Sequence, residues 1–169
     1  MQPFCIDKPE ILLIGMSFYG DPFDVNDPWS EENQIGRTWN RLIAYLNQHE
    51  DAILHRLASN VFYEVHIGGE ETSTNGQFEV FAGVQVERLE LVPVALLVKV
   101  LPATKYAVFT LKGEEILSDW ENTIDRWLSE AGLERIHSFS FQYYDERFKG
   151  LDRISESVLD VYLPVRAAC

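Results

Sequence analysis

The second half of this chain repeats the first at a constant spacing of 81 residues. Seven positions carry the same residue type in both halves: Ile35, Trp39, Ile43, Ser59, Tyr63, Val80 and Val84 match Ile116, Trp120, Ile124, Ser140, Tyr144, Val161 and Val165. The matches keep helical spacing first and strand alternation afterwards, as expected for one supersecondary unit present twice. We therefore predict an α+β fold of two fused β-α-β-β repeats related by a pseudo-twofold axis. A cleft between the repeats would be the natural ligand site.

The hydrophobic pattern places the same elements in each repeat. The first repeat spans about residues 10–87, and its expected elements are a strand over 11–19, a helix with Ile35, Trp39, Leu42, Ile43 and Leu46 on its apolar face, and a hairpin of strands 61–67 and 78–86. Ser30 is a candidate N-cap for this helix. The second repeat spans about residues 94–166, and its expected elements are a strand over 105–111, a helix over 114–128 and strands over 139–146 and 158–165.

Composition limits the class of protein. The 169 residues are 46% hydrophobic, enough for one domain over 1–169 with a sizeable core. A net charge of −13 would repel a phosphate backbone, so we expect no direct nucleic-acid partner. Cys5, Cys169 and the four histidines lack ligand spacing, so we expect no metal, cofactor or disulfide framework. The apolar run over 11–16 is too short for a signal peptide or membrane span, which predicts a cytoplasmic protein.

Strand alternation indicates which side chains could face a ligand. In the last strand Leu159, Val161, Leu163 and Val165 form an apolar face that should pack against the helices. In the preceding strand the apolar set is Phe139, Phe141 and Tyr143, which we assign to the same face. This leaves Tyr144, Glu146 and Tyr162 together on the face away from the helices. Phe81 matches Tyr162 at the 81-residue offset and should share its environment.

Three segments then carry a family resemblance: ATKYAVFTLKG over 103–113, FQYYDERF over 141–148 and LDVYLPV over 159–165. They resemble the GyrI-like superfamily, the effector-binding domains of some AraC-type and multidrug-responsive bacterial transcription regulators. The resemblance implies a concave antiparallel sheet with helices on its outer face and a central cleft. It also implies binding of bulky, often cationic aromatic compounds by an acidic residue surrounded by rings.

The candidate ligand-binding residues follow from the strand faces and the resemblance together. Many relatives carry Glu, one further residue and Tyr on the penultimate strand, where this chain has Gln142 and Tyr144. Glu146 lies two residues further along the same face and is the first candidate for the pocket carboxylate; the alternative is an exposed acid paired with Arg147 or Lys149. The candidate rings are Tyr144, Tyr162, Phe81, Trp39 and Phe18, although the apolar helical face of Trp39 is more simply explained by a position in the core.

The leading functional hypothesis is a small-molecule binding domain that captures an amphipathic organic cation, for sequestration or effector sensing. A carboxylate among rings suits such a ligand, because ring faces attract positive charge. A homodimer or a protein partner is possible, including an inhibitor role like that of the gyrase-binding relatives. The enzymatic alternative is a hydrolase of reactive electrophiles that uses Glu146 with Tyr144 or Tyr162. The sequence contains no recognisable catalytic motif, and no catalytic residue is assigned.

Overall fold

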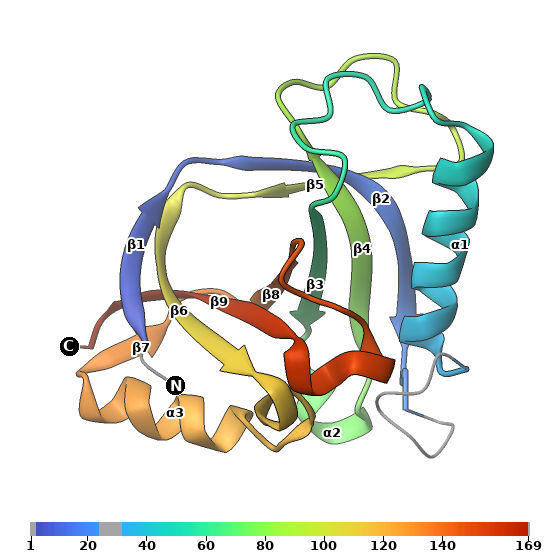
Figure 1. The fold of residues 1–169 in the computed structure, drawn as a ribbon. Helices are drawn as coiled ribbons and strands as arrows, with labels where there is room; N and C mark the ends of the chain where they lie inside the picture. The colour runs from blue at the N-terminus through green and yellow to red at the C-terminus, as the bar shows by residue number, and fades with distance from the viewer. Residues whose placement is uncertain (1–2, 24–31, 169) are drawn as a thin grey trace.

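The computed structural model describes residues 3–23 and 32–168 (Figure 1). In these residues the strands are β1 (Phe4–Lys8), β2 (Ile11–Gly20), β3 (Phe62–Gly68), β4 (Phe78–Val86), β5 (Leu97–Leu101), β6 (Thr104–Lys112), β7 (Leu133–Arg135), β8 (Phe139–Tyr144) and β9 (Val158–Ala167). The α-helices are α1 (Gln34–Gln48), α2 (Thr72–Asn75) and α3 (Glu121–Glu130), and the 3-10 helices are η1 (Gly113–Leu117) and η2 (Leu151–Glu156). No helix among the described residues has the length and apolar character needed to cross a bilayer.

The fold is α+β, with one antiparallel sheet of nine strands in the described residues. Eight strands follow the order β1-β6-β9-β8-β3-β4-β2-β5, and β7 pairs with β9 beside them. The order is symmetric about the β8–β3 pair: β9 and β4 flank it, then β6 and β2, then β1 and β5. The centre of the sheet is therefore the pair of strands that each precede the last strand of a predicted repeat.

The two ends of the strand order are connected through the chain, and the sheet curves into a ring of strands (Figure 1). β1 runs directly into β2, and β5 runs directly into β6. β1 pairs with β6 and β2 pairs with β5 in one continuous register, with Lys8 opposite Thr104 and Ile11 opposite Leu101. The ladder is interrupted at Pro9 and Pro102, because proline has no N–H to donate.

Three hydrophobic clusters stabilise this arrangement. Inside the ring is the interior core, which is rich in aromatic residues and includes Leu13, Tyr63, Val65, Phe81, Tyr106, Val108 and Phe141. On the outside, α1 packs over β2 and β4, and α3 packs over β6 and β9. Both helices lie outside the ring in Figure 1, as the resemblance implied. The outer surface of β3 and β8 lies between the two helix-covered regions.

The helix of the second repeat differs from its prediction over 114–128. Residues 113–117 form the separate 3-10 helix η1, and α3 begins only at Glu121. The break follows from the backbone at Ser118, which is extended at φ −79° and ψ 166° and whose hydroxyl donates to the carbonyl oxygen of Glu115 at 2.7 Å. At the first helix, Ser30 lies outside the described residues. The N-cap is Asn33, whose Oδ1 accepts from the Gly36 N–H at 2.9 Å.

The strand faces confirm one prediction and correct another. Leu159, Val161, Leu163 and Val165 pack against α3 as predicted. The prediction that Tyr144 and Tyr162 share a face is wrong. Phe141 pairs with Tyr162 in the β8–β9 register, so both point into the ring, where their rings stack at 4.5 Å between centroids. Tyr144 is an odd number of residues from Phe141 and points outward.

Candidate functional site

A cavity of about 1150 Å³ opens on the outer surface of β3 and β8, between α1 and α3. The two strands form its floor through Phe62, Glu64 and His66 and through Ser140, Gln142 and Tyr144. Helix α1 contributes Trp39 to one wall, and Trp120 and Glu121 at the start of α3 contribute to the opposite wall. This volume slightly exceeds the range of about 300–1,000 Å³ that is usual for small-molecule sites, so the cavity can hold a bulky ligand.

Glu64 is the central polar residue of the cavity floor. Its side chain is only 5% exposed. The Trp39 indole N–H donates to Oε2, and His66 Nε2 lies 2.7 Å from Oε1. Glu64 is held in place by this pair of contacts and by its position in the central strand β3, where Gln142 of β8 lies directly opposite.

Aromatic rings surround this carboxylate on several sides. Trp39 lies 5.7 Å from Phe62 and 5.1 Å edge-on from Tyr144, measured between ring centroids. Tyr144 in turn meets Phe148 edge-on at 4.8 Å. Beyond His66, Phe78 lies 5.3 Å from the imidazole ring. The cavity therefore offers ring faces and edges close to a buried negative charge.

The charged residues around the cavity are mainly acidic. The carboxylates among the described lining residues are Glu64, Asp119, Glu121, Asp145 and Glu146. Arg135 is the one described lining residue with a permanent positive charge, and it already contacts Asp125 at 2.7 Å. The electrostatic potential in the cavity should consequently be negative, which favours cationic over anionic ligands.

Tyr144 and Gln142 form the second hydrogen-bonded pair on the floor. The Tyr144 hydroxyl donates to Gln142 Oε1 at 2.6 Å. Burial, and then the negative charge of Glu64, raise the pKa of Tyr144 well above its usual value. Tyr144 therefore stays a neutral hydrogen-bond donor at physiological pH and adds no charge to the cavity.

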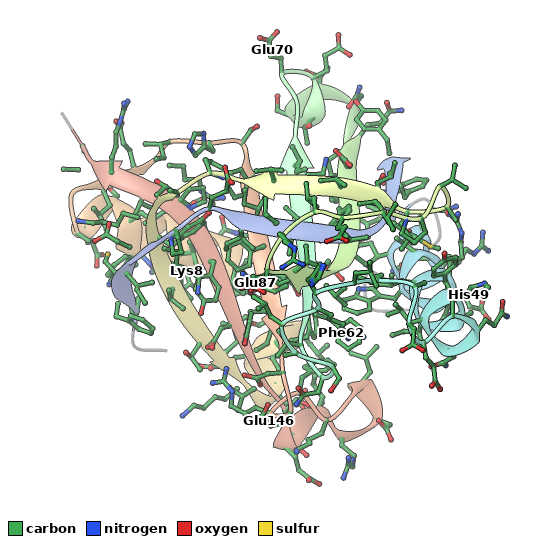
Figure 2. The ribbon with its side chains drawn as sticks, turned by 90° about the horizontal axis from the view of Figure 1, so that it is seen from above. Lys8, His49, Phe62, Glu70, Glu87 and Glu146 are labelled. Atoms are coloured by element: carbon green, nitrogen blue, oxygen red, sulfur yellow. The ribbon has the colours of Figure 1, made fainter. Side chains whose placement is uncertain are left out.

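Four of the residues predicted from sequence line the cavity: Trp39, Gln142, Tyr144 and Glu146. Glu146 is exposed and lies in the turn after β8, at the periphery of the molecule (Figure 2), where its Oε2 accepts from Asn60 Nδ2 at 3.4 Å. Whether these four bind a ligand stays a prediction.

Phe18, Phe81 and Tyr162 are not among the residues that line the cavity. Phe81 is fully buried in the interior core, and Tyr162 packs against that core with Lys8 Nζ 5.1 Å from its ring centroid. Both side chains lie on the face of β4 and β9 that points away from the helices, as predicted, and whether they contact a ligand stays a prediction. The structure brings Glu146 and Tyr144 to one cavity, but not Glu146 and Tyr162.

Sequence reasoning missed Glu64, His66 and Phe62. The signal that could have identified Glu64 is a single carboxylate between apolar residues in the middle of a strand, since such a residue is buried only for a specific reason. The 81-residue offset gave no indication of this position, because it pairs Glu64 with Asp145 and not with its neighbour in the sheet. In the sheet, Glu64 and His66 lie opposite Gln142 and Ser140.

An antiparallel sheet with a ligand-sized, acidic cavity between two helices defines a small-molecule binding domain. The chain belongs to the Cass2 family of integron-associated effector binding proteins, whose model matches residues 6–165. This family assignment confirms the resemblance to GyrI-like effector-binding domains. The protein is thus an effector-binding domain.

Individual relatives are consistent with this family assignment. The chain is 32% identical over 168 residues to the transcriptional regulator BrlR of Pseudomonas aeruginosa, covering 98% of this chain and 56% of BrlR, so it spans about half of that regulator. Two solved structures share the fold: SAV2435 bound to tetraphenylphosphonium (TM-score 0.68, 14% identity, 98% and 94% of the two chains) and the Vibrio cholerae integron cassette protein VCH_CASS2 (TM-score 0.62, 17% identity, 97% and 95%).

Proposed function

We propose that this domain captures a bulky organic cation with aromatic substituents in the cavity between α1 and α3, and that Glu64 is the carboxylate that recognises its charge. The observation that carries the proposal is the burial of Glu64. Among the described residues, its ion-pair partner is a histidine and not a lysine or arginine. A buried carboxylate without a permanent countercharge is costly, and a ligand cation would offset that cost.

The surrounding rings support the same ligand chemistry. A delocalised cation placed on the floor would contact the faces and edges of Trp39, Phe62 and Tyr144. Each well-placed cation–π contact contributes roughly 0.5–2 kcal/mol, more when water is excluded. SAV2435, which shares the fold, was solved with tetraphenylphosphonium bound. At 14% identity this likeness concerns the fold alone, so transfer of the ligand class to this chain is part of the proposal.

The experiment compares two carboxylates of the same cavity. Glu64→Gln should weaken tetraphenylphosphonium binding by about 1–3 kcal/mol, because a charge-assisted contact is lost with little change in shape. Glu146→Gln is the matched control and should change the affinity little, since its charge is exposed to solvent. Isothermal titration calorimetry on the wild type and both variants gives the dissociation constants.

A neutral ligand of similar shape separates charge recognition from damage to the fold. Triphenylphosphine oxide should bind the wild type and Glu64→Gln with similar affinity. Equal weakening of both ligands by Glu64→Gln would contradict the proposal and indicate structural damage, which circular dichroism would reveal. A larger effect of Glu146→Gln than of Glu64→Gln would assign the recognition to Glu146.

We also infer that the two halves of the chain are copies of one β-α-β-β unit, with the cavity floor at their junction. The symmetric strand order and the position of α1 and α3 outside the ring support this inference. In the two central strands β3 and β8, residues that match between the repeats must point to the same face of the sheet. Tyr63 therefore corresponds to Tyr143, which also points to the interior core, and not to Tyr144.

A further inference from the structure

The floor of the cavity places a histidine side chain next to Glu64. His66 lies two residues along β3, so its side chain projects from the same face of the strand. Its Nε2 is 2.7 Å from Glu64 Oε1, and its side chain is 25% exposed. His66 lines the cavity and packs against Phe78, which holds the imidazole at the edge of the floor rather than in bulk solvent.

The two carboxylate oxygens of Glu64 have different partners. Oε2 receives the Trp39 N–H, which is neutral, and Oε1 faces His66. A protonated imidazole at Oε1 would balance the carboxylate charge, whereas a neutral imidazole could supply only a hydrogen bond. The charge state of His66 therefore determines whether the floor of the empty cavity is neutral or negative.

We propose that His66 is an internal competitor for the ligand cation: protonated His66 neutralises Glu64 in the empty cavity, and cation binding expels that proton. This inference rests on the proposed function, because it assigns Glu64 as the shared anion. Two positive charges beside one buried carboxylate repel each other, so the complex with a permanent cation holds His66 neutral. The complex then binds fewer protons than the free domain, and its stability rises with pH.

Other charged and titratable groups face the same cavity. They are Asp119 and Glu121 near the start of α3, Arg135 of β7, His137 before β8, Tyr144 at the end of β8, and Asp145 and Glu146 after it. Histidine is the residue type that ordinarily titrates between pH 5 and 8, so His137 is the competing source of a pH effect in that interval. His137 is exposed, and its ring stacks on Phe139 at 5.5 Å. It therefore serves as the matched control.

The binding experiment uses tetraphenylphosphonium, whose charge does not change with pH. Its affinity for the wild type should increase with pH between 5.5 and 8, by at most about tenfold per pH unit, because at most one proton is released per ligand. Calorimetry in phosphate and in Tris, which differ in ionisation enthalpy, measures the proton release directly. His66→Asn should abolish both effects and bind more tightly than the wild type at pH 5.5, whereas His137→Asn should retain both.

Two outcomes would overturn the inference: binding of tetraphenylphosphonium with no proton release, or the same pH dependence in His66→Asn as in the wild type. A third outcome would refute only the proposed role of Glu64. In that outcome Glu64→Gln binds tetraphenylphosphonium as tightly as the wild type, while His66→Asn still abolishes the pH dependence.

A measurement without ligand tests the contact between His66 and Glu64 even if tetraphenylphosphonium does not bind. In NMR spectra, Glu64→Gln should change the chemical shifts of the His66 ring, because His66 Nε2 contacts Glu64 Oε1. The His137 ring shifts in the same spectra should not change. Identical His66 ring shifts in the two proteins would overturn the contact between His66 and Glu64.

Discussion

The indole N–H of Trp39 is the contact that joins α1 to the acidic floor of the cavity. It donates to Glu64 Oε2, and the same ring packs on Phe62 and Tyr144. One side chain thereby positions the carboxylate and forms part of the cavity wall. Trp120, 81 residues further along the chain, also lines the cavity while packing against the α3 core. Each half of the chain thus places one tryptophan at the cavity.

A double-mutant cycle measures the contribution of this contact to stability. Trp39→Phe keeps an aromatic ring and removes the N–H, and Glu64→Gln keeps the shape and removes the charge. Because Gln keeps an oxygen that accepts the indole N–H, the coupling free energy reports the difference between a charged and a neutral hydrogen bond, and we expect about 1 kcal/mol from denaturant unfolding of the four proteins. Additive effects of the two substitutions would show that the charge of Glu64 does not strengthen its contact with Trp39 in solution.

At the scale of elements, β2 and β4 depend on two glycines that face each other. Gly15 of β2 lies opposite Gly83 of β4 in the antiparallel register. A Cβ at Gly15 would lie 2.0 Å from the carbonyl oxygen of Ala82 and 2.6 Å from Gly83 Cα. Both are backbone atoms that cannot rotate away, so the close approach of the strands beneath α1 requires glycine here.

Gly15→Ala should therefore lower the free energy of unfolding by about 1–3 kcal/mol, the usual range for overpacking. Gly69→Ala is the matched control, because a Cβ there would meet only Thr72 Oγ1, at 4.0 Å. Thermal and urea unfolding of both variants gives the comparison. If Gly69→Ala destabilises the domain as much as Gly15→Ala, the loss reflects a general cost of alanine at glycine sites and not this strand contact.

Elements with local signals were predictable from the sequence. The apolar stripe from Ile35 to Leu46 identified α1, and alternation identified β2, β4, β6 and β9 close to their observed ends. The predicted range of the second helix is too long, because Ile116 and Trp120 continue a helical spacing across the break at Ser118. Periodicity reports which side chains are apolar, and it does not report an extended residue between two helical turns.

At the scale of the whole molecule, the features that determine the site come from contacts between distant residues. The pairing of β1 with β6 and of β2 with β5 closes the ring, and no local pattern encodes it. The β8–β9 register determines that Phe141 and Tyr162 share the interior face, which separates Tyr162 from Tyr144. Gln142 and Tyr144 line the cavity together, because alternation places both on one face of β8. Trp39, whose helical spacing favoured a core position, also lines the cavity.

The position of a bound cation would show directly whether Glu64 recognises its charge. Tetraphenylarsonium has the shape and charge of tetraphenylphosphonium and contains an arsenic atom that scatters anomalously. In crystals of the complex, we expect one arsenic peak in the cavity between α1 and α3, within about 6 Å of the Glu64 carboxylate, the range over which opposite charges interact strongly. A peak inside the ring of strands beside Tyr162, or one at Glu146 with Glu64 left uncovered, would contradict it.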